Sequence, residues 1–296
     1  MDFENKKSLK KTANGLGFYI FTIILVMYFV SIITTVFATM LNGSVNNTGI
    51  LLIENMASIS ALFIVGIFYC LISNTSINDV LPLGKTSGKM IVKTVIIALA
   101  VSFISDYYTE VFVSGMSLFG IHNNVEMSYE SHSVVENILY IISIAVIPPL
   151  TEEFAFRGII LSKLRKYGDS FAILISALLF GLLHGNIVQI PFAFIIGIVF
   201  GFITIKTNSI LPSMITHFIV NFTSVVVSLI EENNFFDKNI TEIIYMLFIL
   251  AVFILAIISA LSLARDKKFF KLEKYDITPF KVRLKQFFAT AGVISA

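Results

Sequence analysis

The chain has 296 residues, of which 56% are hydrophobic and 14% are charged, and its formal net charge is +2. An average soluble domain has about 25% charged residues, and a soluble protein cannot hide so much apolar surface. This composition excludes a soluble enzyme, a nucleic-acid-binding domain and a disordered chain. The mean hydropathy of +0.89 indicates a protein whose solvent is a lipid bilayer.

Eight segments are apolar enough to predict membrane-spanning helices, since a crossing needs about 20 mostly apolar residues. In chain order they are residues 17–41, 48–73, 90–118, 136–163, 170–185, 187–205, 209–230 and 241–264. The first is too long for the apolar core of a signal peptide, so we expect it to be retained. The fifth is short, and only three residues (184–186) separate it from the sixth, which predicts a tight helical hairpin. The predicted fold class is an all-α, polytopic membrane helix bundle.

The sequence shows no internal repeat and no soluble domain. We divide it into an N-terminal membrane region with three spans, residues 1–134, and a helical core, residues 135–230. Residues 231–296 form the last span and a basic tail. We expect this tail to lie against anionic lipid headgroups rather than to bind a protein partner.

The basic residues predict how the eight spans are oriented. Nineteen of the 21 Lys and Arg residues fall on one side, before the first span, after the eighth and in or at the edges of every second loop. The opposite loops carry acids, namely Glu126, Glu130, Glu231, Glu232 and Asp237. Because cytoplasmic loops are enriched in Lys and Arg, we expect a multi-pass protein of the cell membrane with both termini cytoplasmic.

The fourth span carries ionisable groups, which are costly inside a membrane and suggest function. Its proline pair Pro148-Pro149 is followed by Glu152-Glu153. We expect the prolines to interrupt the helix, so that both glutamates lie in the first turn of a half-helix, where backbone N–H groups favour negative charge. Arg157 lies four residues beyond Glu153 and can neutralise it. A structural ion pair explains only one of the two acids, so the additional carboxylate suggests chemistry.

Two further spans contribute polar side chains. His184 lies at the end of the fifth span, and His217 and Asn221 share one face of the seventh. A histidine at a helix end is often structural, and a polar pair can simply join helices. However, at about 1.5 Å per helical residue, Glu152 and the two histidines lie within about 10 Å of a common depth. We therefore predict one buried polar site, nearer the cytoplasmic half.

These side chains suit the hydrolysis of an amide bond. A carboxylate and a histidine can activate water, either directly as a general base or through a metal ion. Asparagine and histidine N–H groups can stabilise the oxyanion of a tetrahedral intermediate. No serine stands in a strand–turn–helix nucleophile setting, and the HExxH zinc motif is absent. Glu152, His184 and His217 could still bind zinc from separate segments, so metal dependence stays open.

Three motifs in this order resemble those of the CPBP family of intramembrane endopeptidases. They are Glu152-Glu153-x-x-x-Arg157, Phe180-x-x-x-His184 and His217-x-x-x-Asn221. The family includes CAAX prenyl proteases and bacterial bacteriocin-processing or bacteriocin-immunity proteins. Each motif alone is weak, but three in order on successive apolar helices are specific. The resemblance covers about residues 135–226.

The resemblance implies four catalytic residues, Glu152, His184, His217 and Asn221, and two supporting residues, Glu153 and Arg157. The first glutamate, with the first histidine, would activate the attacking water. The second histidine and the asparagine would stabilise the oxyanion. The family has been described both as metalloproteases and as metal-independent glutamate proteases, and we favour the latter, with no cofactor. The implied partner is a membrane protein or peptide substrate.

The composition also bears on the substrate. The chain has 17 Lys against 4 Arg and is rich in Ile, Phe and Asn, which suggests an AT-rich, bacterial genome. CAAX prenylation is a eukaryotic signal, so we expect no prenylated substrate. Peptide or membrane-protein processing, or self-immunity to a bacteriocin, fits the bacterial branch better. Two other classes stay open, a transporter or channel, which usually shows repeated halves, and a non-catalytic membrane scaffold or immunity protein.

Overall fold

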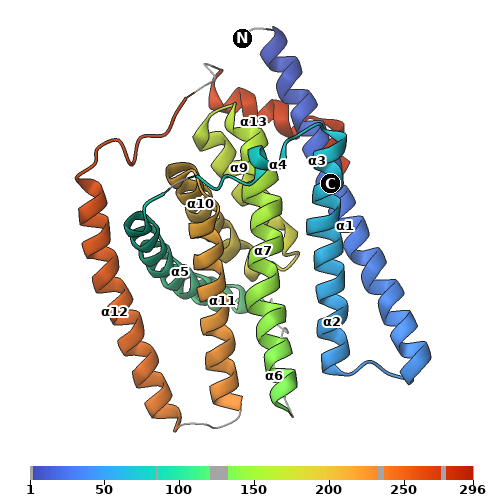
Figure 1. The fold of residues 1–296 in the computed structure, drawn as a ribbon, viewed down its shortest axis with the longest axis vertical. Coiled ribbons are helices and arrows are strands. Elements are labelled where there is room, and N and C mark those ends of the chain that lie inside the picture. Colours follow the sequence, from blue (N-terminus) through green and yellow to red (C-terminus); the bar gives the residue numbers. More distant parts are fainter. Residues whose placement is uncertain (1–2, 85, 121–132, 233–236, 275–277, 296) are drawn as a thin grey trace. The chain divides into compact units, whose positions relative to one another are not determined.

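The computed structural model describes residues 3–84, 86–120, 133–232, 237–274 and 278–295. Every named regular element in these ranges is a helix, which confirms the predicted all-α class (Figure 1). Glu126 and Glu130, which supported the predicted orientation, lie outside the described residues.

Within the described ranges, seven helical segments are long and apolar enough to cross a membrane. They are Lys7–Leu41, Thr48–Ile72, Gly88–Ser117, Val134–Arg165, Gln189–Thr207, Leu211–Ile230 and Lys238–Ala264. These segments confirm a polytopic membrane bundle. The remaining predicted span, residues 170–185, forms the apolar helix α9 (Asp169–Leu183), whose 15 residues fall short of the usual crossing of about 20. The predicted side of the two termini depends on whether α9 crosses, and it stays a prediction.

The chain folds into two compact units, each built from separate stretches of sequence. The first comprises Met1–Pro82, Leu150–Ser176 and Leu272–Ala296, and the second comprises Leu83–Pro149 and Ala177–Lys271. The fourth span and α9 each contribute to both units. The predicted regions 1–134, 135–230 and 231–296 divide the chain by position in the sequence, whereas the two units divide it by contacts in space. The sequential division stays a prediction.

In the first unit, a long helix and the last helices of the chain pack together. Its complete elements are α1 (Phe3–Asn42), α2 (Asn47–Ser58), η1 (Ile59–Ile64), α3 (Val65–Ile72), α4 (Ile77–Val80), η3 (Phe154–Leu161), α8 (Ser162–Arg165), α13 (Phe280–Phe288) and α14 (Ala291–Ser295). Helix α1 contacts α2, η1 and α3, and it also contacts α13 and α14. At the α1–α14 contact, the Gly292 N–H donates to Asn14 Oδ1 at 2.9 Å. A Cβ on Gly17 would collide with the Gly292 backbone, so the two backbones touch.

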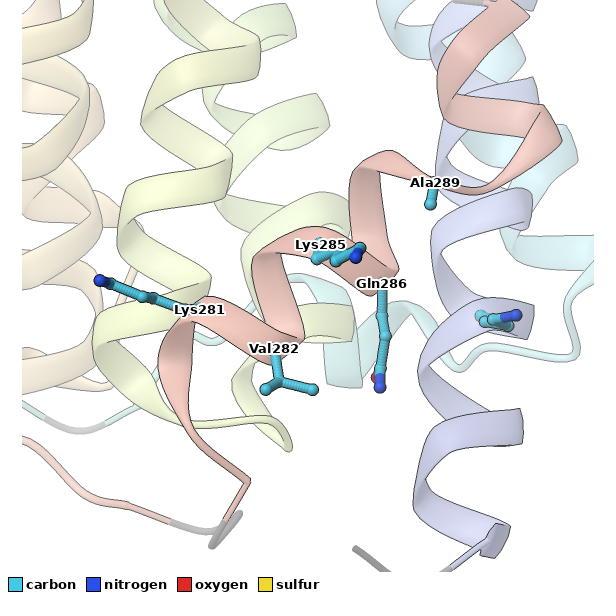
Figure 2. A pocket seen from close by; sticks show the side chains of 6 residues that line it. Lys281, Val282, Lys285, Gln286 and Ala289 are labelled. Atoms are coloured by element: carbon cyan, nitrogen blue, oxygen red, sulfur yellow. The ribbon is translucent and has the colours of Figure 1, made fainter.

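The basic segment after the last span is attached to this unit. Asp169 joins it twice, because its carboxylate accepts from the Glu273 N–H at 2.9 Å and its own N–H donates to the Glu273 carbonyl at 3.1 Å. The Arg283 guanidinium donates to the Tyr167 carbonyl and lies 5.3 Å from the centre of the Phe171 ring. A pocket of about 490 Å³ beside α13 (Figure 2) is lined by Lys10, Lys281, Val282, Lys285, Gln286 and Ala289. Contact of this lysine-rich surface with lipid headgroups stays a prediction.

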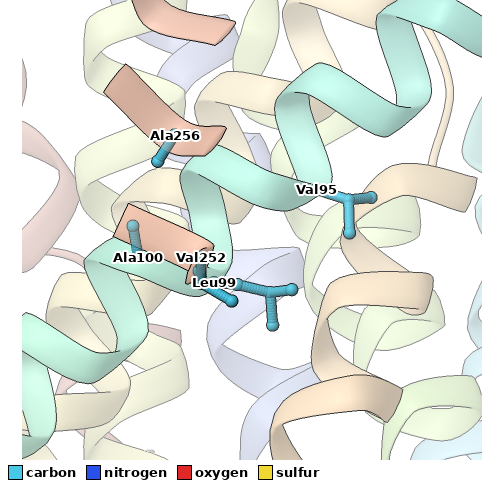
Figure 3. Close-up of a cluster of buried hydrophobic side chains, with 5 residues drawn as sticks. All are labelled: Val95, Leu99, Ala100, Val252 and Ala256. Carbon is cyan, nitrogen blue, oxygen red and sulfur yellow. The ribbon is translucent and has the colours of Figure 1, made fainter. Parts of the chain in front are cut away.

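In the second unit, one central helix packs against three others. Its complete elements are α5 (Gly88–Ser117), α6 (Val134–Ile141), η2 (Ile142–Val146), α10 (Gln189–Thr207), α11 (Leu211–Glu232) and α12 (Lys238–Ala264). Helix α5 contacts α10, α11 and α12. A buried cluster between α5 and α12 (Figure 3) consists of Val95, Leu99, Ala100, Val252 and Ala256. A second cluster joins α5 to α10 through Ala98, Ile196, Phe200 and Ile203. Together these clusters hold α10 and α12 on α5.

The fourth span is helical from Val134 to Arg165, with two π-helical stretches. The first stretch, η2, leads into α7 (Ile147–Glu153), which contains both prolines, and the second, η3, follows directly. The prediction that Pro148-Pro149 interrupts the helix is therefore wrong, and the glutamates do not lie in a first turn. A π-helical turn shifts the hydrogen-bond pattern, which lets a helix pass through residues that lack an N–H.

The π-helical stretch η3 approaches α4 closely at Gly158. A Cβ on Gly158 would lie 2.6 Å from the Val80 carbonyl oxygen. We expect Gly158→Ala to lower the free energy of unfolding by about 1–3 kcal/mol, because backbone would have to move. Thermal unfolding in detergent measures the change. Gly115→Ala in α5 is the control, since nothing lies within 4 Å of that Cβ position. Equal melting temperatures for the two variants would contradict the close contact.

Candidate active site

The predicted site residues divide between the two units. Glu152, Glu153 and Arg157 belong to the first unit, and His184, His217 and Asn221 belong to the second. Within the first unit, the structure brings Glu153 and Arg157 together. Within the second, it places both histidines against the same aromatic ring. The joint action of all six residues is a proposal.

Glu153 and Arg157 form a fully buried ion pair. Arg157 Nη1 lies 2.8 Å from Glu153 Oε1, and both side chains are 0% exposed. The predicted pairing is thus confirmed. A buried charge is expensive unless it is paired and hydrogen-bonded, so each of these residues requires the other. The next turn of η3 is tied to α9, because the Ser176 hydroxyl donates to the Phe156 carbonyl at 2.9 Å.

Glu152 precedes this pair by one residue and is half-buried. Successive residues of an α-helix are rotated by about 100°, so Glu152 and Glu153 leave α7 in different directions. Thr151 on the other side of Glu152 is buried, and its hydroxyl lies 3.4 Å from that of Ser58 in α2. The two neighbouring glutamates therefore have different environments, one fully buried and the other partly accessible.

His184 stands immediately after α9, where the chain turns. Gly185 adopts a left-handed conformation with φ of 63°, as is common where a helix ends. The His184 Nδ1 atom lies 2.9 Å from the Phe180 carbonyl oxygen. A carbonyl can only accept a hydrogen bond, so Nδ1 carries the hydrogen. This tautomer leaves the lone pair on Nε2, the nitrogen that can then accept a proton or bind a metal.

A phenylalanine ring lies between the two histidines. The centre of the Phe180 ring is 5.0 Å from that of His184 and 6.2 Å from that of His217, both with edge-to-face geometry. The centre of the Phe200 ring lies 5.6 Å from that of His217. Phe180 and Phe200 are buried and come from α9 and α10, while His217 comes from α11. Three helices therefore fix the orientation of the two imidazoles through one aromatic cluster.

Small residues allow α9 and α10 to come close enough for this cluster. A Cβ on Gly197 would lie 2.9 Å from the Cα of Ala177, and one on Gly181 would lie 3.1 Å from the Ile190 carbonyl oxygen. Gly, Ala and Ser let helix backbones approach closely in membranes. The predicted hairpin of the fifth and sixth spans is confirmed, with residues 184–188 linking α9 to α10.

Asn221 on α11 is bound to the fourth span. Its Nδ2 atom donates to the Ile144 carbonyl in η2 at 2.8 Å. Ile144 and Phe200 are not among the residues predicted from the sequence. No motif marks Phe200. Ile144 could have been found, because it lies four residues before a proline and such a carbonyl loses its usual helical donor.

A zinc site needs at least three protein ligands. Within either unit, the described residues contain no group of three or more His, Cys, Asp or Glu side chains that could hold a metal ion. The ligands considered from the sequence, Glu152, His184 and His217, come from both units. A metal site made from them therefore stays untested.

The comparisons with known proteins agree with the motifs. Residues 134–223 match the family described as "Type II CAAX prenyl endopeptidase Rce1-like", and this interval contains all six predicted site residues. The resemblance to the CPBP family is confirmed, because the region that bears the motifs is similar to Rce1-like CAAX endopeptidases.

A relative in Bacillus subtilis carries the name "Putative membrane peptidase YdiL". It is 26% identical over 147 residues, which cover 47% of this chain and 60% of the relative. The chain thus aligns with less than two thirds of that protein. No solved structure matches the chain.

Removing one partner of the buried ion pair should greatly lower the stability of the fold. We expect Arg157→Met to lower the free energy of unfolding by about 3–5 kcal/mol, because it leaves the Glu153 carboxylate buried without its guanidinium. Adding Glu153→Leu removes that charge and should recover much of the loss. Chemical unfolding in detergent measures both variants. A single variant as stable as the parent would show that the pair contributes nothing to folding.

Proposed function

We propose that this chain is an intramembrane endopeptidase that hydrolyses a peptide bond in a membrane-associated protein or peptide. The observation that carries the proposal is that all three motifs occur, in order, within the region that matches the CAAX endopeptidase family. Two of the motifs lie on helices long and apolar enough to span a membrane, which supports a reaction within the membrane.

In this proposal Glu152 is the general base. The neighbouring acid, Glu153, is bound by the Arg157 guanidinium, which favours Glu152 for proton transfer. Its carboxylate takes a proton from water while the water oxygen forms a bond to the substrate carbonyl carbon. His184 assists through Nε2, which accepts a hydrogen bond from the same water because Nδ1 donates to Phe180. The C–N bond then breaks as the proton held by Glu152 passes to the leaving nitrogen.

His217 and Asn221 are the proposed donors to the oxyanion. Addition of water moves an electron pair onto the substrate carbonyl oxygen, and N–H groups aimed at that oxygen stabilise it. The aromatic contacts of His217 support a fixed ring orientation, which makes such a donor effective without rearrangement. In this proposal Glu153 and Arg157 support the site by holding the helix that carries Glu152.

We propose a bacterial, non-prenylated substrate, with bacteriocin processing or self-immunity as the setting. The Lys-rich composition and the relative in Bacillus subtilis support a bacterial context. We also propose that both termini are cytoplasmic. This orientation requires α9 to cross the membrane, although its 15 residues extend only about 22 Å.

The decisive variant is Glu152→Ala. We expect cleavage to fall by at least about 100-fold, because general-base catalysis is lost, while the protein stays folded and inserted. Mass spectrometry of terminal peptides from membranes and medium compares cells that carry the parent or the variant at matched expression. Glu54→Ala, which removes another acid from an apolar span, is the control and should leave cleavage intact.

Full cleavage by Glu152→Ala would defeat the enzyme assignment. Identical termini in all strains, together with bacteriocin protection that survives both Glu152→Ala and His217→Ala, would instead favour the non-catalytic scaffold or immunity protein.

The effect of removing metal distinguishes a metalloprotease from a metal-independent glutamate protease. We expect a membrane-permeant zinc chelator to leave cleavage by the purified protein unchanged, because the proposed steps use only side chains of the chain. Loss of cleavage on chelation and its return on addition of zinc would instead assign Glu152, His184 and His217 as metal ligands.

A further inference from the structure

The proline pair removes the helical partner of one specific carbonyl. In an α-helix the Ile144 carbonyl accepts from the N–H of residue 148, and in a π-helix it accepts from residue 149. Both positions are proline, which has no N–H. Ile144 lies in η2, the π-helical stretch immediately before the pair. Neither helical pattern can therefore supply this carbonyl with a backbone donor.

A side chain 77 residues away supplies the missing donor. Asn221 Nδ2 lies 2.8 Å from the Ile144 oxygen, within normal hydrogen-bond distance. Water is scarce inside a bilayer, so a carbonyl that lacks a donor there destabilises the fold. The hydrogen bond of Asn221 thus compensates for the proline pair and joins α11 to the fourth span.

The same bond determines which way the Asn221 amide faces. A carbonyl oxygen can only accept, so the amide must turn its NH2 group, not its oxygen, toward Ile144. An NH2 group has two hydrogens, and Ile144 engages one of them. The second N–H is then held in a fixed direction.

We propose that Pro148-Pro149 is a positioning device for Asn221. By freeing the Ile144 carbonyl, the pair anchors the Asn221 amide through one N–H and leaves the other to stabilise the oxyanion. The second half of this statement rests on the proposed function, whereas the coupling between the prolines and Asn221 does not. If the prolines only bent the helix, replacing them would not change how much Asn221 contributes to stability. The positioning proposal instead predicts that the prolines and Asn221 are energetically coupled.

A double-mutant cycle measures that coupling in the full-length protein in detergent. In the parent, Asn221→Ala should lower the melting temperature by about 2–8 °C, because a carbonyl loses its donor. In the background Pro148→Ala/Pro149→Ala, a backbone N–H becomes available to Ile144 in either helical pattern, and the same substitution should lower the melting temperature by less than half as much. The single replacements Pro148→Ala and Pro149→Ala each supply one N–H. They are the alternative backgrounds for the cycle if the double replacement does not fold.

A matched control lies on the same helix. The buried Thr216 hydroxyl donates to the Pro212 carbonyl at 2.8 Å, so this hydrogen bond lies entirely within α11 and its acceptor is not a carbonyl of the fourth span. Thr216→Val should lower the melting temperature equally in both backgrounds. An equal effect of Asn221→Ala in both backgrounds, or no effect in the parent, would overturn the proposal.

Cleavage assays separate the two roles of Asn221. In the proline-replaced background, Asn221→Ala should recover stability yet still fail to cleave the peptides identified with the parent, because its second N–H is absent. Restored cleavage would overturn the assignment of that N–H to the reaction while leaving the proline coupling intact. If the protease proposal itself is wrong, a different result is expected, because Glu152→Ala would then cleave as well as the parent.

Discussion

Inside a bilayer, a backbone carbonyl or a charge that lacks a partner cannot turn to water. This constraint explains both the hydrogen bond to the Ile144 carbonyl and the ion pair of Glu153 with Arg157. The backbone satisfies itself in helices, and where Pro148-Pro149 prevents that, a side chain from α11 takes over. The same condition binds Glu153 to Arg157. Glu153 with Arg157, and the Ile144 carbonyl with Asn221, are thus matched pairs, and the proposed chemistry uses groups whose geometry leaves a nitrogen or oxygen for a substrate.

Close packing follows from the same environment. Lipid tails are as apolar as leucine, so helices in a membrane associate through close van der Waals packing rather than through the hydrophobic effect. Contacts that need glycine occur at the α1–α14 crossing, at the approach of Gly158 to Val80, and in the α9–α10 hairpin. Each lets backbones approach further than a side chain would permit. The aromatic cluster around Phe180 depends on the last of these contacts, because α9 and α10 supply two of its rings.

The features that are local in sequence could be predicted. Seven spans follow from runs of apolar residues, and the ion pair follows from the four-residue spacing of Glu153 and Arg157. The donor to the Ile144 carbonyl could not be predicted, because it comes from Asn221, a residue far along the chain. The place of Phe200 beside His217 likewise results from packing between α10 and α11, which no local pattern encodes. The division into two interleaved units is also a property of long-range contacts.

The contact between Asn14 and Gly292 has a consequence for biosynthesis. These residues are 278 positions apart, yet they meet in one unit. Domains ordinarily fold as they emerge, with the N-terminal part first. Here the first span enters the membrane long before its partner has been translated, and the face that α13 and α14 later cover has to wait. Assembly of this unit is therefore completed only after α14 has been translated, and until then the face of α1 that α13 and α14 cover stays accessible to lipid or to other proteins.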